Sequence, residues 1–234
     1  MNDFYLFANC NFVPDKYNDW QTAYDSLATY VFSSEPTTKS YYFGIPIDYA
    51  HDMSKTTSMF AFEVYGSRED LYTTHLTSPA MQTFLQNIQP ASTTGLDLAH
   101  YRLIAGFLDA SNTRAPAQIM QDIRITCNSP AARAAIIDSL SKLVNTVDGS
   151  EEGTLTYMGF SSLDDDVGVR MYGRWRSRED FECFIRRDEV NNFWAGNKSS
   201  VRAMEQRLYV PNGKGWLHRG TGYAGEDKGR NVKL

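Results

Sequence analysis

The chain has 234 residues, enough for one large domain or two small ones with a buried core. Its apolar content of 42% and charged content of 22% are typical of a globular protein, and a net charge of −5 argues against general nucleic-acid binding. Three cysteines without a CxxC motif predict a reducing compartment and no metal site. Since no apolar run approaches the length of a membrane span, we expect a cytoplasmic protein without a membrane or nucleic-acid partner.

The first half of the chain predicts the element order β-α-β-β-α-β. A strand "FYLFANCNFV" begins at residue 4, and a helix follows Pro14, with apolar residues on one face at Tyr17, Trp20, Tyr24, Leu27 and Val31. The turn and strand "EPTTKSYYFGI" begin at residue 35, and the strand "SMFAFEVY" covers residues 58–65. A second helix after residue 67 and the strand "AHYRLIAGF" at residues 99–107 complete the half.

The second half repeats this order. The strand "DIRITCN" precedes a helix that starts at Ser129-Pro130, and the strands "EEGTLTYMGF" and "VGVRMYGRW" follow. A second helix and the strand "MEQRLYVPN" end the repeat. This order describes a ferredoxin-like unit, and two such units commonly close on each other through their bare sheet faces. We therefore expect an α+β chain of two tandem ferredoxin-like units, at residues 1–110 and 119–212, and a glycine-rich basic tail at residues 213–234.

The tetrapeptide Ser-Arg-Glu-Asp occurs at the same corner of both halves. In each copy a serine precedes an aspartate by three positions, Ser67 before Asp70 and Ser177 before Asp180, directly ahead of an apolar-periodic run. This is the spacing of a helix capping box, worth about 1 kcal/mol. The tetrapeptide therefore predicts a helix start rather than a catalytic acid.

The first half resembles the antibiotic biosynthesis monooxygenase family of dimeric α+β barrels. The resemblance rests on "FVPDK", "EPTTKSYY", "FEVYGSREDLYTTHLTSPAMQTF" and "HYRLI", and the second half keeps "EEGTLTY" and "YGRWRSREDF". It implies an intramolecular dimeric α+β barrel. It also implies a monooxygenase of secondary metabolism that needs no cofactor and oxidises a small aromatic or polyketide-like phenol with O₂.

Candidate site residues follow from the resemblance and from the strand faces. His75 or Glu63 would move the proton, Asn9 and Tyr65 would stabilise an oxyanion, and Trp175 would stack on the substrate. Further substrate contacts are expected from Tyr41, Phe43, Phe60, Phe62, Tyr157, Tyr172 and Arg174. Each also has a structural explanation: the rings could fill the core, and Glu63 could pair with Arg170 or Arg174.

Several alternatives stay open at this stage. A non-oxidative cyclase, isomerase or lyase could use the same acid–base groups, and a ligand-binding barrel would need none of them. Haem-degrading relatives carry an Asn, a Trp and a His where this chain has Asn9, Tyr65 and His75, and where its second half has Cys127, Trp175 and Ile185. We expect no cofactor and no metal, with haem or flavin not excluded, and the sequence leaves homo-oligomerisation open.

Overall fold

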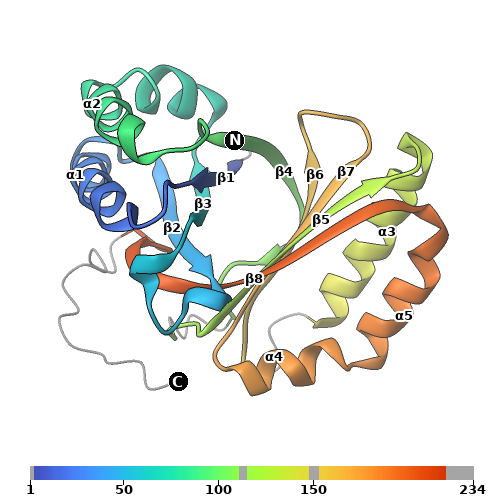
Figure 1. Cartoon of the computed structure of the whole chain (residues 1–234). Helices are drawn as coiled ribbons and strands as arrows, with labels where there is room; N and C mark the ends of the chain where they lie inside the picture. The colour runs from blue at the N-terminus through green and yellow to red at the C-terminus, as the bar shows by residue number, and fades with distance from the viewer. Residues whose placement is uncertain (1–2, 111–114, 148–152, 220–234) are drawn as a thin grey trace. The chain divides into compact units, whose positions relative to one another are not determined.

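The computed structural model describes residues 3–110, 115–147 and 153–219 (Figure 1). The first half contains β1 (Phe4–Asn11), α1 (Tyr17–Ser34), β2 (Thr38–Pro46), β3 (Ser58–Tyr65), the π-helix η3 (Asp70–His75), α2 (Pro79–Ile88) and β4 (Asp97–Phe107). The second half contains β5 (Ile119–Cys127), α3 (Pro130–Val147), β6 (Thr154–Ser162), β7 (Gly168–Trp175), α4 (Arg178–Ile185), α5 (Asp188–Asn197) and β8 (Val201–Trp216). The predicted order is confirmed, with the second helix of each half divided into two.

The strands form an antiparallel barrel with the order β1-β3-β2-β8-β5-β7-β6-β4. This confirms the predicted α+β class with ferredoxin-like repeats. No helix in the described part of the chain is both long and apolar enough to cross a membrane.

The chain divides into two compact units whose boundaries differ from the expected ones. Unit 1 comprises residues 1–98 and 211–234, and unit 2 comprises residues 99–210. Two strands therefore change unit along their length: most of β4 belongs to unit 2, and the last part of β8 belongs to unit 1. The reason is strand pairing, because β4 pairs with β6 of the second half rather than ending with the first.

Unit 1 is a sheet with helices α1 and α2 on one face (Figure 1). In β3 the residues Ala61, Glu63 and Tyr65 face these helices, while Phe60 and Phe62 point the other way, as strand alternation requires. Aromatic rings join the helices to the sheet: Trp20 of α1 lies edge-on to Phe84 of α2 at 5.6 Å, and Tyr24 contacts Phe43 of β2 at 4.3 Å. The face that carries Glu63 is thus covered by aromatic side chains.

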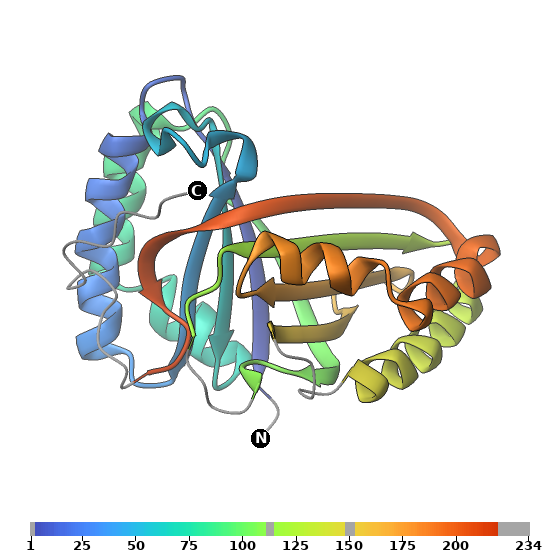
Figure 2. The ribbon, with the colours of Figure 1, turned by 90° about the horizontal axis from the view of Figure 1, so that it is seen from below.

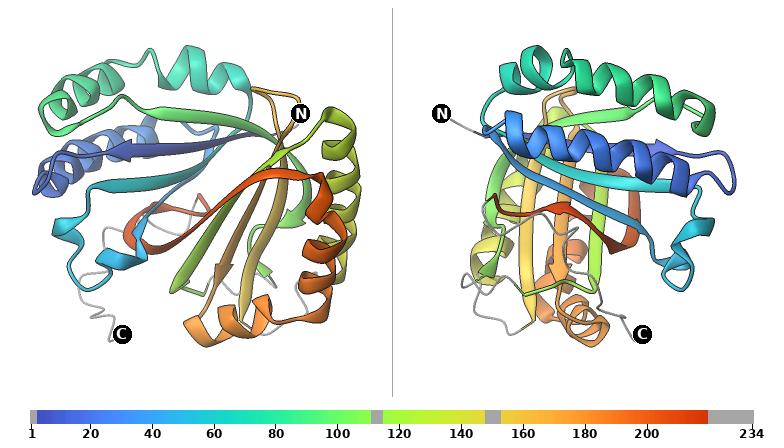
Figure 3. Two further views of the ribbon diagram at one scale, coloured as in Figure 1. Left: turned by 45° about the vertical axis from the view of Figure 1, so that its right-hand side comes forward. Right: turned by 90° about the vertical axis from the view of Figure 1, so that its left-hand side faces the viewer.

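Unit 2 repeats this layout with α3 and α5 side by side on its sheet (Figure 3). The apolar stripe of α3 is buried at Ile136, Leu140, Leu143, Val144 and Val147. The serine at the start of this helix acts as a cap, since Ser129 Oγ accepts the backbone N–H of Ala132 at 3.1 Å.

Both predicted capping serines accept the expected hydrogen bond. The backbone N–H of Asp70 donates to Ser67 Oγ at 3.2 Å, and that of Asp180 donates to Ser177 Oγ at 3.0 Å. Each serine hydroxyl in turn donates to the aspartate carboxylate, at 2.8 and 2.6 Å. The tetrapeptide has a structural role in both copies.

The C-terminal strand extends further than the expected tail boundary at residue 213. Strand β8 continues to Trp216, which is 2% exposed, and its end lies beside β2 (Figure 2). Gly215 permits this approach, because its φ is +72° and a Cβ there would lie 1.8 Å from the carbonyl oxygen of Tyr41. Residues 213–219 are therefore part of the folded unit 1, and the rest of the expected tail lies outside the described residues.

Candidate active site

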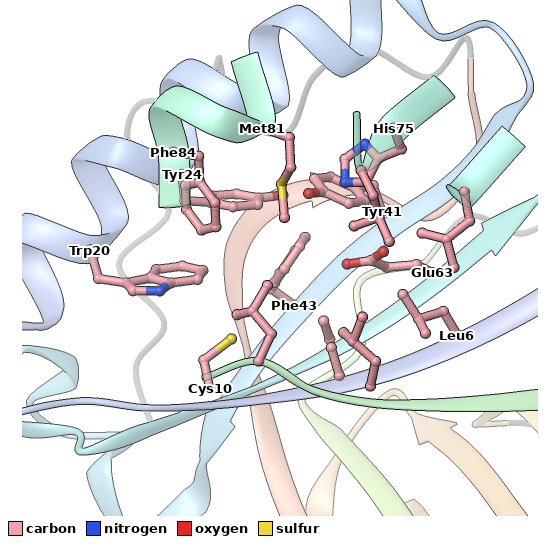
Figure 4. Close-up of a pocket in the computed structure, with 16 residues that line it drawn as sticks. Leu6, Cys10, Trp20, Tyr24, Tyr41, Phe43, Glu63, His75, Met81 and Phe84 are labelled. Atoms are coloured by element: carbon pink, nitrogen blue, oxygen red, sulfur yellow. The ribbon is translucent and has the colours of Figure 1, made fainter. Parts of the chain in front are cut away.

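A small cavity lies in unit 1 between the sheet and its helices (Figure 4). Its volume is about 30 Å³, room for one or two water molecules. Aliphatic and aromatic side chains form most of the wall, and the polar groups that reach it include Glu63, His75 and the tyrosines 24 and 41. Of the lining residues, Leu76, Leu96 and Leu98 are only half-buried, so they mark the side nearest to solvent.

His75 is held in the cavity wall by a buried carboxylate. Its Nδ1 lies 2.9 Å from Glu35 Oε2, and the two side chains are 2% and 1% exposed. Because a carboxylate accepts hydrogen bonds, this contact places the proton on Nδ1 and leaves the lone pair on Nε2. Such a pair can act as a general base, with the carboxylate orienting the ring and stabilising the imidazolium that forms.

Glu35 is anchored by its own turn. It follows the end of α1, where its backbone N–H donates to the carbonyl of Val31, and Thr38 Oγ1 donates to its Oε2 at 3.4 Å. The other carboxylate oxygen, Oε1, is buried and has no hydrogen-bond partner among the described residues. A buried carboxylate held in this way is costly, which points to a functional reason for its position.

Glu63 is the second carboxyl group of the site. Burial raises its pKa to about 7, against the opposing effects of His75 and of a hydrogen bond from Tyr65; the charge of Glu35 raises the pKa further. Tyr65 Oη donates to Glu63 Oε2 at 2.7 Å, and burial together with the Glu63 charge raises the pKa of Tyr65 well above its ordinary value. Glu63 can therefore hold or release a proton near neutral pH, while Tyr65 stays protonated.

The rings of Tyr41 and Tyr65 flank the imidazole. Their centroids lie 5.8 and 5.6 Å from that of His75, and Figure 4 shows His75 and Glu63 around Tyr41. The site thus brings together an oriented imidazole, a carboxyl group that titrates near pH 7, and aromatic walls.

The π-helix determines which residue faces the cavity. Ser67 precedes the first residue of α2, Pro79, by one position more than Ser177 precedes the first residue of α5, Asp188. The extra residue is absorbed in η3, whose wider turn closes with a hydrogen bond from the backbone N–H of Leu76 to the carbonyl of Leu71.

As a result, the spatial counterpart of His75 in unit 2 is Phe184 and not the expected Ile185. Phe184 contacts Tyr157 and Trp175 at 4.8 and 5.1 Å, just as His75 contacts Tyr41 and Tyr65. Ile185 is 37% exposed.

The same region of unit 2 is filled by aromatic rings. Strand register places Gly173 where unit 1 has Glu63, opposite Tyr157 as Glu63 is opposite Tyr41. A Cβ at Gly173 would lie 2.2 Å from the Trp175 indole, so the ring occupies the space that a carboxylate takes in unit 1. Trp175 also packs on Phe181 and is fully buried. Unit 2 therefore lacks the histidine and the carboxyl group at these two positions.

Three of the predicted residues lie on the other face of the unit 1 sheet. Asn9, Phe60 and Phe62 alternate with the residues that line the cavity and are not part of its wall. The expected role of Asn9 as an oxyanion donor does not fit this site, because Leu6, Ala8 and Cys10 are the residues of β1 that face it. The register also corrects its counterpart in unit 2, which is Arg124 rather than Cys127.

The expected arginine partners of Glu63 bind elsewhere. Arg170 makes a bidentate ion pair with Asp122 at 2.6 and 2.7 Å, and both side chains are buried in unit 2. Arg174 donates to Thr156 Oγ1 at 3.1 Å, on the face of β7 that also carries Tyr172. The partner of Glu63 is Tyr65.

The Asn, Trp and His trio of haem-degrading relatives was matched above to Asn9, Tyr65 and His75, and the structure does not bring these three side chains together. Asn9 lies on the opposite face of the sheet from Glu63 and Tyr65, and so away from His75. Among the described residues, no group of three or more His, Cys, Asp or Glu side chains is arranged to hold a metal ion.

Glu35 was not anticipated from the sequence. In "EPTTKSYY" a glutamate before a proline is typical of an exposed turn, and its burial depends on residues far away in the chain. The extra residue between Ser67 and α2, compared with Ser177 and α5, can in contrast be seen in the sequence, and the π-helix η3 lies in that segment.

Neither a family model nor a curated protein matches the sequence. Solved structures do match. A putative monooxygenase from Lactobacillus acidophilus aligns over 90% of this chain and 94% of its own at a TM-score of 0.72 and 10% identity. A putative monooxygenase from Fusobacterium nucleatum covers 90% and 93% at a TM-score of 0.75 and 12% identity. An anthrone oxidase-like protein covers 90% and 92% at a TM-score of 0.62 and 11% identity.

These alignments cover nearly the full length of each matched protein. At identities of 10–12% they establish a shared fold. The chain has the same tandem α+β barrel fold as these three proteins.

Proposed function

We propose that the chain is a monooxygenase-like enzyme that uses no cofactor and oxidises a planar, uncharged phenol or anthrone of polyketide type in the unit 1 cavity. The observation that carries the proposal is the buried Glu35–His75 pair beside a carboxyl group whose pKa is about 7. The fold similarity to an anthrone oxidase-like protein supports the choice of substrate class.

The charges of the cavity favour a substrate that enters neutral. The Glu63 carboxyl group and the His75 imidazole line it, Glu35 is bonded to that imidazole, and no Lys or Arg is among the lining residues. An anionic substrate would meet like charge in a site of low dielectric, which costs more than the same contact in water. A neutral substrate with a weakly acidic C–H or phenol O–H group avoids this cost, because it gives up its proton only after binding.

The cavity must widen to admit such a substrate. Ligand pockets usually measure about 300–1,000 Å³, roughly ten times the 30 Å³ of this cavity. The half-buried Leu76, Leu96 and Leu98 and the unbranched Met81 form the part of the wall that can rearrange at least cost.

The proposed reaction with anthrone is balanced by one O₂. Nε2 of His75 removes a proton from C10, and Glu35 stabilises the imidazolium. The resulting carbanion transfers an electron to O₂, and the radical pair joins to form a C–O bond and a peroxide, which takes up the proton held by the imidazolium. Nε2 of His75 then removes the second C10 proton, the carbonyl forms as the O–O bond breaks, and hydroxide leaves as water with a proton from Glu63. Proton transfer from the imidazolium to the Glu63 carboxylate restores both groups. The sum is anthrone plus O₂ giving anthraquinone plus water.

The test is oxygen consumption with anthrone as the probe, compared with its spontaneous oxidation in buffer. We expect one O₂ consumed for each anthraquinone formed, label from ¹⁸O₂ in the product, and a kcat reduced by roughly 100-fold or more in His75→Ala. Since Glu63 must be protonated to release water, kcat should fall above pH 7, with an apparent pKa of about 7.

Other outcomes would redirect the assignment. A product that forms equally well under argon would mean a cyclase, isomerase or lyase that uses the same proton-transfer groups. Tight binding without turnover, unchanged in His75→Ala, would mean a ligand-binding barrel. Either result would refute the oxygenase proposal.

A further inference from the structure

The segment after β8 carries a cation to the back of the Glu35 turn. Arg219 is the last described residue of the chain, and its guanidinium donates to three backbone carbonyls of unit 1. Nη1 bonds the carbonyl of Thr38 at 2.9 Å, and Nη2 bonds the carbonyls of Val31 and Phe32. These carbonyls lie on both sides of Glu35, at the end of α1 and at the start of β2.

This geometry ties together the two elements between which Glu35 is held. The last carbonyls of a helix have no partner within it and carry the negative end of the helix dipole, so a cation is favourable there. The guanidinium also lies over the rings of Phe32 and Trp216, at 5.1 and 5.7 Å. Burial lowers the pKa of Arg219, and the charge of Glu35 opposes that shift.

The same segment supports the other side of the site. Ser40 Oγ donates to the carbonyl of Leu217 at 2.6 Å, and the Trp216 ring packs on Tyr41 at 5.4 Å. Tyr41 is one of the two rings that flank His75. Residues 215–219, which we call the C-terminal strap, therefore contact both the Glu35 turn and Tyr41 while lining no part of the cavity themselves.

We propose that Arg219 is a positioning residue of the active site, which fixes the Glu35 turn so that Glu35 stays aimed at Nδ1 of His75. The inference rests on the proposed function, in which His75 is the base. It assigns a role in catalysis to a residue that contacts neither substrate nor reacting atoms.

The first experiment compares two cations of the C-terminal segment. Arg219→Met should lower kcat for anthrone by roughly 10-fold, as is common when the partner of a catalytic group loses its orientation, with KM changed less than twofold. The matched control is Lys214→Met. Lys214 pairs with Asp25 of α1 at 2.9 Å, and both side chains are partly exposed. Equal losses in the two variants would overturn the proposal.

A double variant tests whether Arg219 acts through Glu35. In a Glu35→Gln background, adding Arg219→Met should cause little further loss of kcat, because the two residues serve one function. Independent, multiplying losses would contradict the proposal. If Arg219→Met does not fold, Arg219→Lys decides: a lower kcat at unchanged Tm supports the role of the guanidinium fork, and an unchanged kcat refutes it.

A readout independent of turnover separates this inference from the proposed function. Diethyl pyrocarbonate modifies accessible histidines, and His75 is only 2% exposed. Peptide mapping should show faster modification of His75 in Arg219→Met than in the wild type or in Lys214→Met, with the exposed His51 as internal reference. If wild type does not oxidise anthrone but this difference appears, the proposed function fails and the positioning role stands. If His75 stays equally protected, the positioning role fails.

Discussion

Glu63 is a carboxyl group in an apolar cavity, and Tyr65 donates a hydrogen bond to it. Its ionisation in this surrounding opposes folding. Burial raises its pKa to about 7 from an ordinary value of 4.5. The unfolded chain loses this proton as pH rises through 4.5, whereas the folded chain keeps it until about pH 7. The contribution of protonated Glu63 to the unfolding free energy is therefore fully present below pH 4.5. It is lost as pH rises from 4.5 to about 7 and does not return above pH 7.

We predict that Glu63→Gln removes this pH dependence. The amide cannot ionise, and its oxygen can still accept the hydrogen bond from Tyr65. Relative to wild type, the variant should gain roughly 3 kcal/mol in unfolding free energy between pH 4.5 and pH 8. Urea denaturation of both proteins at several pH values measures the difference, in which most contributions of other groups cancel. A constant difference across this range would show that Glu63 has an ordinary pKa in the folded protein.

Two glycines of the C-terminal segment provide a matched pair at the residue scale. Gly213 and Gly215 have φ of +73° and +72°, but only Gly215 has backbone atoms where a Cβ would lie. Gly213→Ala should cost about 1 kcal/mol, the strain of a left-handed alanine. Gly215→Ala should cost roughly 3 kcal/mol or more, since the strand must also move away from Tyr41. Equal losses in chemical denaturation would contradict the close approach of the two backbones.

At the scale of the element, the π-helix η3 holds one residue more than the corresponding segment of unit 2, and a deletion can test this. Thr74 and Cys183 are both exposed and each directly precedes an inward ring, His75 or Phe184. Deleting Thr74 removes the extra residue, so the segment from Ser67 to the start of α2 becomes as long as that from Ser177 to the start of α5, and η3 can become α-helical. In the variant the histidine follows Leu71 by three positions instead of four. Residues three apart lie on the same face of an α-helix, so the imidazole remains on the side of Leu71.

We therefore expect the Thr74 deletion to fold, with an unfolding free energy within about 1 kcal/mol of wild type. Deleting Cys183 should cost roughly 3–5 kcal/mol, because Phe184 leaves its buried position as it would in a Phe→Ala change. Thermal and urea denaturation provide the comparison. Similar losses for the two deletions would argue against an inserted residue in η3.

The order of elements could be predicted because each has a strong local signal. Alternation marked β3 to the residue, and the apolar stripe marked α1. The unit boundaries could not be predicted, since the exchange of β4 and β8 depends on which strands pair rather than on any local pattern. The same holds for Trp216: a run of glycines reads as a flexible tail until the strand beside it is known.

The site was predictable in part for the same reason. Strand alternation placed Glu63 and Tyr65 together, and the family resemblance added His75, but Asn9 was assigned without a register. Glu35 and Arg219 could not be predicted as site residues, because each acts through contacts with segments distant in the sequence. A carboxylate in a turn and an arginine near the end of a chain look ordinary in one dimension.

At the scale of the whole molecule, the two repeats differ at the candidate site, which the described residues form in unit 1. Unit 1 has the carboxyl group, the imidazole and the cavity, while the corresponding positions of unit 2 hold Gly173, Phe184 and the Trp175 indole. Duplication lets one copy keep stability while the other bears the cost of buried charges, which are rarely neutral to folding. The protein should then bind one planar ligand per chain rather than two.

Titration with emodin, a hydroxylated anthraquinone that resembles the proposed product, tests this stoichiometry by calorimetry. We expect one site per chain, lost in Ala61→Met, because Ala61 lines the cavity and the register gives unit 2 a methionine, Met171, at the same place. The reverse change in unit 2, Met171→Ala, should leave both the stoichiometry and the affinity unaltered. Two equivalents per chain, or binding that survives Ala61→Met but not Met171→Ala, would place a ligand in unit 2. That result would refute the view that the asymmetry between the repeats confines the chemistry to the first.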